Sequence, residues 1–396
     1  MARLTPQDSD PPVGFASGGV RLKTIDALRG AAALGVLLFH ASDVRGVSDG
    51  ESVSYAALES VLNWGRYGVW LFFVISGFCI HLNWAKRSQS GPAPPPAFGP
   101  FWLRRFRRLY PAYFAAIVCY VASLYAEGAE FTGRVIAGIG LHLVFMQNFA
   151  PWGIYTVNEV MWTLAIEEQL YLLYFAFLAI RIRFGPMAAI VAALAARVFW
   201  FGLAFLLHRF WNVDILVTQA ALPQWFIWVL GAIGVEAWLG LVRLPAWTRQ
   251  WRTAITILPL AALVSYLYLY VLDAGPLRHI AWFFTDILWG LGFFVLVNTS
   301  VTLEGRTGRV AAWLAGAGLF SYSLYLTHEL VTAHAWNFLI ARQPGIGGIP
   351  SLILLIALAA VSLAFARIFF HFFERPFLST TAVERAPGAP RIQYGQ

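Results

Sequence analysis

The chain has 396 residues, of which 59% are hydrophobic and only 12% are charged. Ordinary soluble domains carry about 25% charged residues, so this composition excludes a soluble protein. The formal net charge of +8 does not indicate a nucleic-acid partner, because the basic residues of a membrane protein gather in its cytoplasmic loops.

Residues 1–20 are polar and rich in Gly, Pro, Ser and Asp, which predicts a short disordered cytoplasmic tail. Residues 379–396 are expected to form a second tail, with the transmembrane domain at residues 21–378 between them. A membrane-spanning helix needs about 17–25 predominantly apolar residues. This condition predicts an all-α bundle of about ten transmembrane helices, near 25–43, 66–84, 109–126, 162–180, 186–207, 224–241, 253–272, 281–299, 318–340 and 351–373.

The distribution of charge predicts the orientation of these spans. With the N-terminus in the cytoplasm, most of the 28 Lys and Arg residues fall in inner segments, as the positive-inside rule requires. An even number of spans then places the C-terminus in the cytoplasm as well. The apolar run from Val135 to Phe149 is short, and counting it as a span would break the alternation. We therefore expect it to be re-entrant or interfacial.

The first span contains two ionisable residues, Arg29 and His40. Eleven residues close three helical turns to within about 20°, so the two side chains share one helix face, about 16 Å apart along the axis. Ionisable groups inside spans indicate functional sites, and imidazole suits a base near neutral pH. The structural alternative is that Arg29 snorkels toward the membrane surface and His40 links helices by hydrogen bonds.

Four arginines occupy the cytoplasmic edge of the third span: Arg104, Arg105, Arg107 and Arg108. Guanidinium groups suit the bidentate recognition of phosphate, so the cluster is a candidate site for an anionic ligand. The alternative is a topology anchor or a contact with lipid headgroups.

Two adjacent carboxylates, Glu167 and Glu168, open the fourth span from the outer side. Negative charge at a helix N-terminus is favoured by the dipole, so one of them is explained by capping. The two side chains point about 100° apart. We expect Glu167 to face the bundle interior on the same side as Tyr171, and Glu168 to turn toward lipid headgroups or a neighbouring loop.

His328 in the ninth span and His81 in the second are further candidates for substrate contact, although each also fits a packing role. Tyr171 in the fourth span is a candidate for substrate contact as well. No spacing of His, Cys and Asp resembles a metal site, and no metal is expected.

Together these residues resemble the acyltransferase-3 family of bacterial membrane enzymes. The matching stretches, in family order, are Arg29-x10-His40, Phe73-Val74-Ile75-Ser76-Gly77-Phe78, Arg104-Arg105-x-x-Arg108, Thr163-Leu164-x-x-Glu167-x-x-Leu170-Tyr171 and Ser321-Tyr322-x-Leu324-Tyr325-Leu326-x-His328. The fused soluble esterase-like domain of some members is not expected here.

The resemblance implies an O-acyltransferase of the bacterial inner membrane that moves an acyl group from cytoplasmic acyl-CoA, most often acetyl-CoA, to a carbohydrate or similar hydroxylated acceptor. It implies that His40 is essential and that Arg104, Arg105 and Arg108 lie near the donor phosphates. His40 then acts either as a base or as a transient acyl carrier, and Glu167 is expected to orient it. The rival interpretation is a transporter or flippase for a polar substrate, because buried His, Glu and Arg also suit a substrate pathway.

Overall fold

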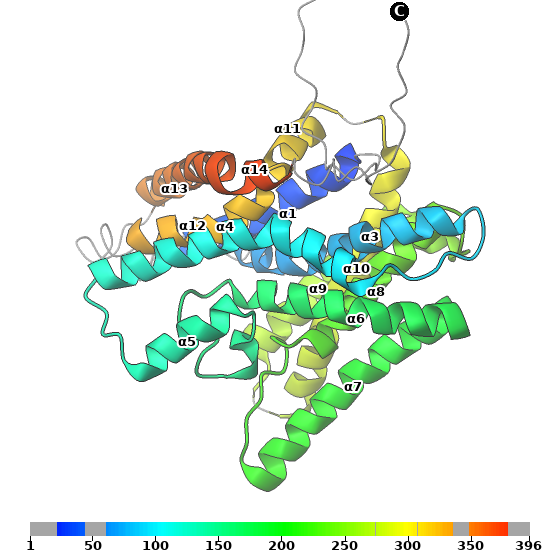
Figure 1. The fold of residues 1–396 in the computed structure, drawn as a ribbon, viewed down its shortest axis with the longest axis horizontal. Helices are drawn as coiled ribbons and strands as arrows, with labels where there is room; N and C mark the ends of the chain where they lie inside the picture. Colours follow the sequence, from blue (N-terminus) through cyan, green and yellow to red (C-terminus); the bar gives the residue numbers. More distant parts are fainter. Residues whose placement is uncertain (1–21, 44–60, 274, 307, 336–347, 379–396) are drawn as a thin grey trace, which may run out of the picture.

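A computed structural model describes residues 22–43, 61–273, 275–306, 308–335 and 348–378. Within these ranges the regular structure is helical, which confirms the predicted fold class (Figure 1). The two predicted tails, 1–20 and 379–396, lie outside the described residues. The helices are, in chain order, α1 (Lys23–Asp43), α3 (Gly68–Ser88), α4 (Phe98–Ala126), α5 (Gly133–Leu143), α6 (Trp162–Phe184), α7 (Pro186–Trp211), α8 (Ala221–Trp238), α9 (Trp251–Tyr266), α10 (Pro276–Ser300), α11 (Arg309–Gly318), α12 (Ser321–Ala335), α13 (Gly348–Phe369) and α14 (Arg375–Leu378).

Short 3-10 and π segments join or extend these helices. The 3-10 segments are η1 (Trp64–Tyr67), η2 (Gln147–Phe149), η3 (Ala246–Arg249) and η5 (Val301–Leu303). The π-helical segments are η4 (Leu267–Val271), which extends α9, and η7 (Phe370–Glu374), which links α13 to α14.

Among the described residues, eight helices are long and apolar enough to cross a membrane. A ninth span results if α11 and α12, which are bent by 74° at the break between them, are taken together. The predicted span 224–241 corresponds to α8, which has 18 residues and is not among the eight. At 1.5 Å per residue its length is about 27 Å, close to the hydrocarbon thickness of about 30 Å. The total of ten spans and their orientation stay predictions.

The apolar run that was expected not to cross forms α5 and the 3-10 turn η2. With eleven residues, α5 is about 16 Å long, roughly half the hydrocarbon thickness. Its length agrees with the prediction. Thr132 caps the helix, because its side chain accepts a hydrogen bond from the backbone N–H of Val135.

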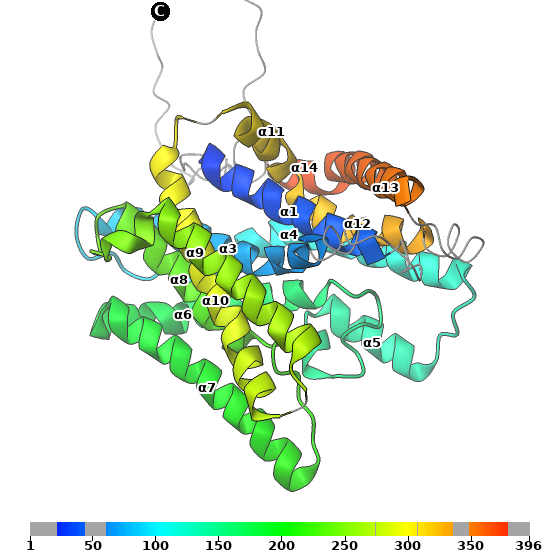
Figure 2. The ribbon, with the colours of Figure 1, turned by 180° about the vertical axis from the view of Figure 1, so that it is seen from behind.

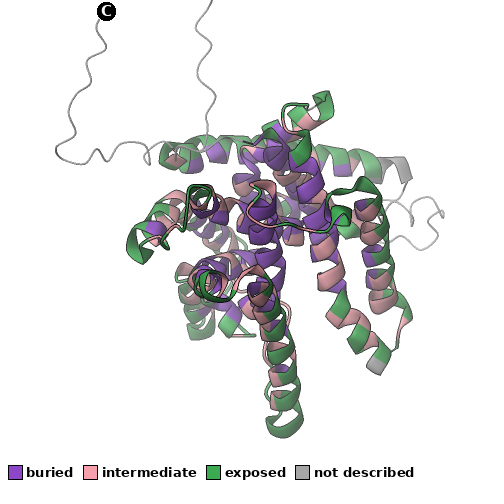
Figure 3. Ribbon diagram, turned by 90° about the vertical axis from the view of Figure 1, so that its right-hand side faces the viewer, coloured by how far each residue is buried: buried purple, intermediate pink, exposed green. Residues whose placement is uncertain are grey.

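The bundle has a buried centre and a peripheral hairpin. Gly185, with φ of 91°, ends α6, and Pro186 begins α7 at once, so the chain reverses sharply there. From this turn α6 and α7 diverge (Figures 1 and 2). Large apolar side chains of α7, such as Phe199 and Phe210, are exposed as expected for a surface facing lipid. Buried residues instead concentrate where the other helices cross (Figure 3).

Close helix crossings in this centre depend on glycine. A Cβ on Gly77 of α3 would lie 2.0 Å from the carbonyl oxygen of Trp228, and one on Gly231 of α8 would lie 1.9 Å from that of Val74. Only glycine permits such an approach, and small residues of this kind allow membrane helices to pack backbone to backbone. As a result α8 is almost wholly buried and stands directly behind α3.

Candidate active site

A pocket of about 690 Å³ lies where α1, α3, α4 and α6 meet. Lys86 and Arg87, near the end of α3, line it and make one side basic. Ser76 and Cys79 line it further along the same helix. The structure brings six of the predicted site residues to its wall: Arg29, Arg104, Arg105, Arg108, Glu167 and Tyr171.

The arginine cluster divides between two faces of α4. Arg104, Arg105 and Arg108 line the pocket, whereas Arg107 is exposed and is not part of its wall. The guanidinium carbon of Arg105 lies 3.8 Å from the ring centroid of Phe101 and 5.6 Å from that of Tyr171. Such cation–π contacts hold the guanidinium in one place. Arg105 is therefore held in place in the pocket wall, next to Arg104 and Arg108.

Glu167 is hydrogen-bonded inside the pocket wall. Its Oε1 accepts from the hydroxyl of Tyr171 at 2.6 Å and from that of Ser76 at 3.1 Å. This agrees with the expectation that Glu167 shares a side of the helix with Tyr171.

The expectation for Glu168 was wrong. Its side chain is 8% exposed and is hydrogen-bonded by Trp102, with Arg105 close enough to interact electrostatically. The physical reason is that residues of α4 cover this side of α6, so a rotation of about 100° from Glu167 leads to another protein surface and not to lipid.

His40 lies at the other end of α1 from Arg29, about 16 Å along the axis. It is not part of the pocket wall as the described residues define it. Its imidazole is next to that of His328 on α12, with ring centroids 5.1 Å apart. His328 is 1% exposed, and its Nδ1 donates to the carbonyl oxygens of Tyr325 at 2.8 Å and Leu324 at 3.1 Å. Its Nε2 has no hydrogen-bond partner among the described residues.

The structure thus pairs His40 with His328, and the expected contact with Glu167 is not found. Among the described residues no hydrogen bond or ion pair joins Glu167 to His40. Spacing along two separate helices could not show which side chains meet, because that depends on how the helices cross.

Sequence reasoning missed Glu374, a carboxylate in the π-helical segment η7. It is 4% exposed and accepts hydrogen bonds from the hydroxyl of Ser323 at 2.5 Å and from its backbone N–H at 3.1 Å. Its charge acts on both Arg108 and Arg29. π-helical segments are frequent at functional sites, and a carboxylate ending the last apolar run was the available signal.

No group of His, Cys, Asp and Glu side chains suited to a metal ion occurs in the described ranges. The fold and the pocket together define a multi-pass integral membrane protein with a basic binding pocket inside its helical bundle. A family model described as an acyltransferase domain matches residues 22–371, and the chain belongs to this acyltransferase-3 family.

Several bacterial proteins are similar to the chain. The peptidoglycan O-acetyltransferase OatA of Listeria monocytogenes is 29% identical over 171 residues, covering 40% of this chain and 24% of the relative. A putative O-acetyltransferase of Staphylococcus aureus (strain COL) is 23% identical over 398 residues, covering 89% of this chain and 56% of the relative. The putative peptidoglycan O-acetyltransferase YrhL of Bacillus subtilis is 28% identical over 169 residues, covering 39% and 23%. The chain spans about half the length of these relatives or less. No solved structure matches it.

Proposed function

We propose that the protein transfers an acetyl group from acetyl-CoA to a hydroxyl of a cell-surface carbohydrate. The observation that carries this proposal is the pocket, whose wall combines three arginines with the hydrogen-bonded pair Glu167 and Tyr171. Arginine recognises phosphate by charge-assisted hydrogen bonds, and the donor carries its phosphates at one end and its thioester at the other. Relatives named as peptidoglycan O-acetyltransferases support a glycan acceptor.

In this proposal the donor phosphates bind Arg104, Arg105 and Arg108, and the acyl end extends past Ser76 and Glu167 toward His40. His40 takes the proton of the acceptor hydroxyl, whose oxygen bonds to the acyl carbon. The carbon–sulfur bond breaks, and CoA leaves as the thiol after it receives a proton.

The alternative route uses His40 as an acyl carrier. An imidazole nitrogen bonds to the acyl carbon, the carbon–sulfur bond breaks, and CoA leaves as the thiol with the proton that the imidazole gives up. The acceptor oxygen then bonds to the acyl carbon while the carbon–nitrogen bond breaks, and the freed imidazole takes the proton of the acceptor hydroxyl. In either route His328 lies beside the reacting histidine, and Arg29 and Glu167 supply opposite charges along the path from the pocket.

The test is CoA release by the purified full-length protein with acetyl-CoA and peptidoglycan fragments. We expect CoA release that depends on acceptor, with a matching mass increase of one acetyl group on the fragment. CoA release without acetylated fragment would reject this acceptor class. No CoA release with any glycan, under conditions where the protein stays folded, would contradict the function itself.

A further inference from the structure

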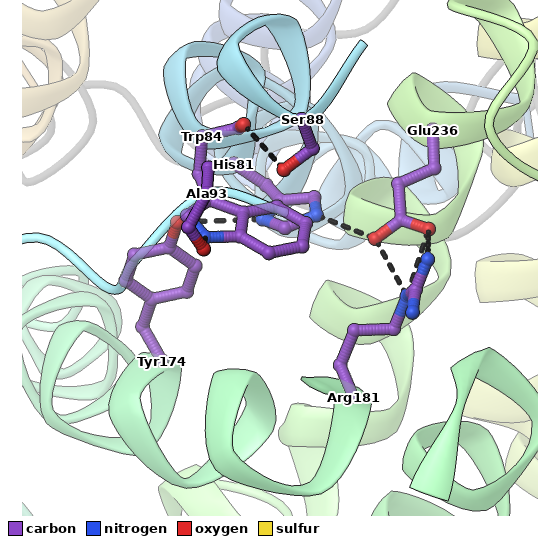
Figure 4. A network of polar contacts seen from close by, with 7 residues as sticks. All are labelled: His81, Trp84, Ser88, Ala93, Tyr174, Arg181 and Glu236. Carbon is purple, nitrogen blue, oxygen red and sulfur yellow. Dashed lines mark hydrogen bonds and ion pairs between the residues drawn. The ribbon is translucent and has the colours of Figure 1, made fainter. Parts of the chain in front are cut away.

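A network of polar contacts reaches the pocket through Trp84 and Tyr174, which line it (Figure 4). Arg181 of α6 donates to both carboxylate oxygens of Glu236 on α8, from Nε at 2.9 Å and from Nη2 at 2.8 Å. The same carboxylate is 2.8 Å from Nε2 of His81 on α3, and the side chains of His81 and Glu236 are both fully buried. One carboxylate on α8 therefore joins α3 and α6, two helices whose residues line the pocket.

These contacts determine whether Nδ1 of His81 donates or accepts a hydrogen bond. A carboxylate only accepts, so Nε2 of His81 carries the hydrogen that bonds to Glu236. Arg181 already balances the charge of Glu236, and a buried imidazolium would have no second carboxylate to offset it. The neutral imidazole then has a lone pair at Nδ1, which lies 3.3 Å from the hydroxyl oxygen of Tyr174. Tyr174 consequently donates its only hydrogen to His81.

The imidazole of His81 is held by its neighbours. The ring of Trp84 stacks on it, with centroids 4.9 Å apart, and the ring of Phe177 meets it edge-on at 5.1 Å. Trp84 is itself fixed, because its indole N–H donates to the carbonyl oxygen of Ala93 at 3.1 Å. The imidazole therefore cannot turn to exchange its two nitrogens.

Tyr174 and Trp84 both line the pocket, beside the basic residues Arg87 and Arg105. With its hydrogen committed to His81, the oxygen of Tyr174 can only accept hydrogen bonds from a ligand. We propose that Tyr174 is a recognition residue that accepts a hydrogen bond from an N–H group of the acyl-CoA donor, and that His81 and Glu236 are positioning residues that fix this polarity. The inference rests on the proposed function, because it assumes an acyl-CoA donor.

The role goes beyond stability. A buried ion pair contributes little net stability compared with apolar side chains of the same volume, so stability alone does not account for this arrangement. A second buried ion pair joins Nη2 of Arg197 to Oδ2 of Asp286 at the longer distance of 3.4 Å. Neither of these two residues lines the pocket. This second pair is an example of a buried ion pair without contact to the pocket.

The experiment compares donor binding by three full-length single variants and by the double variant Tyr174→Phe/His81→Gln, all in detergent. Binding is measured by calorimetry with CoA and with phosphopantetheine. Tyr174→Phe removes the acceptor. His81→Gln keeps a donor near the position of Nε2 for Glu236 but places no acceptor at the position of Nδ1, so it releases the hydroxyl of Tyr174. Tyr120→Phe is the matched control, because Tyr120 is also buried and donates to the carbonyl oxygen of Leu326 away from the pocket.

We expect Tyr174→Phe and His81→Gln each to weaken CoA binding by about 2- to 10-fold, the range of one lost neutral hydrogen bond. The double variant should lose no more affinity for CoA than either single variant, because both changes act on the same hydrogen bond between Tyr174 and the donor. Tyr120→Phe should bind as the wild type does. If affinity for phosphopantetheine falls as much as affinity for CoA, the N–H group is a pantetheine amide. If affinity falls for CoA alone, the N–H group is the adenine amino group.

Additive losses, or unchanged CoA affinity in both single variants, would overturn the inference while the wild type still binds CoA. If the wild type binds no CoA, the proposed donor is wrong and the inference falls with it. A His81→Gln protein that fails to fold leaves the Tyr174→Phe result to decide, because that change removes a single oxygen atom.

Discussion

The two ends of α1 carry the two halves of the candidate site, and they are built differently. At the Arg29 end, residues of four helices line a basic pocket in which charges and hydrogen bonds are shared among many side chains. At the other end, His40 has one imidazole neighbour, His328, whose second nitrogen has no hydrogen-bond partner among the described residues. Binding distributed over many groups weakens in steps when one is removed, whereas chemistry carried by one group is lost at once.

The largest expected contrast is that the two ends of α1 lie on opposite sides of the membrane. We expect Ser90→Cys, in the loop before α4, to be labelled only from the cytoplasm and Arg134→Cys, at the start of α5, only from outside, because this orientation places most basic residues inside. Both positions are exposed. The measurement uses a membrane-impermeant maleimide on cells with Cys79 and Cys119 replaced. Labelling of both cysteines from one side would refute the arrangement.

The next effect concerns His40. We expect His40→Ala to lower acetyl transfer by about 10²- to 10⁴-fold, the range for loss of a general acid–base group, without loss of protein from the membrane. The measurement is CoA release by purified protein. His334→Ala is the control, because His334 is an exposed histidine on the same helix as His328. Normal turnover by His40→Ala would remove the histidine end from the mechanism.

At the pocket end, each single substitution should weaken acetyl-CoA binding only in part. We expect each change of Arg104, Arg105 or Arg108 to Gln to weaken acetyl-CoA binding by about 10- to 100-fold, the range of one charge-assisted hydrogen bond. Arg107→Gln should have little effect, since Arg107 is not part of the pocket wall. Calorimetry on the four single variants makes the comparison. Equal losses in all four would mean that the cluster acts by net charge alone.

A smaller effect should separate the two adjacent carboxylates. Because Glu167 accepts from Ser76 and Tyr171 inside the pocket, we expect Glu167→Gln to lower kcat by about tenfold, as for one lost charge-assisted hydrogen bond. Glu168 is buried beside Arg105, so Glu168→Gln should leave kcat near the wild-type value and change the KM for acetyl-CoA instead. Steady-state kinetics of both variants decide. The reverse ranking of kcat would assign the catalytic carboxylate to Glu168.

The smallest effect lies at the entrance to α1. Glu304 caps this helix by accepting from the backbone N–H groups of Lys23 and Thr24 at 2.9 and 3.0 Å. Burial alone would raise the pKa of the Glu304 carboxyl, but the hydrogen bonds from Thr24 and Lys23 outweigh it and hold the pKa below its ordinary value. A lowered pKa in the folded state contributes stability that is present above the unfolded value and is lost as pH falls through the folded one.

Accordingly, Glu304→Gln should lower the melting temperature at pH 7 by an amount equivalent to about 1 kcal/mol, as for loss of a helix cap. The difference from wild type should shrink in acid, below the ordinary carboxyl pKa. A difference that is constant across pH would show that the charge of Glu304 does not stabilise the helix.

The sequence by itself determined the class of fold and several residues of the pocket wall, but not that the arginines and Glu167 would meet in one pocket. Apolar runs of sufficient length specify membrane helices, because unsatisfied backbone groups are too costly in lipid. The resemblance to the acyltransferase-3 family singled out Arg104, Arg105 and Arg108, and all three line the pocket. Their positions three and four residues apart agree with one side of a helix. The spacing of Glu167 and Tyr171, four residues apart, likewise predicted that they would be neighbours.

Only the tertiary structure decided which helices meet. Glu168 was assigned to lipid headgroups or a neighbouring loop because helix periodicity gives the angle between two side chains but not what covers each face. Glu236 is 155 residues from His81, and Glu374 is 51 residues from Ser323, so no local pattern relates either pair. Their contacts follow from close crossings such as that of Gly77 with Gly231, where backbones approach at distances that only glycine allows. The partners of buried charges are fixed by these crossings, and a linear sequence does not specify the angle or depth at which two helices cross.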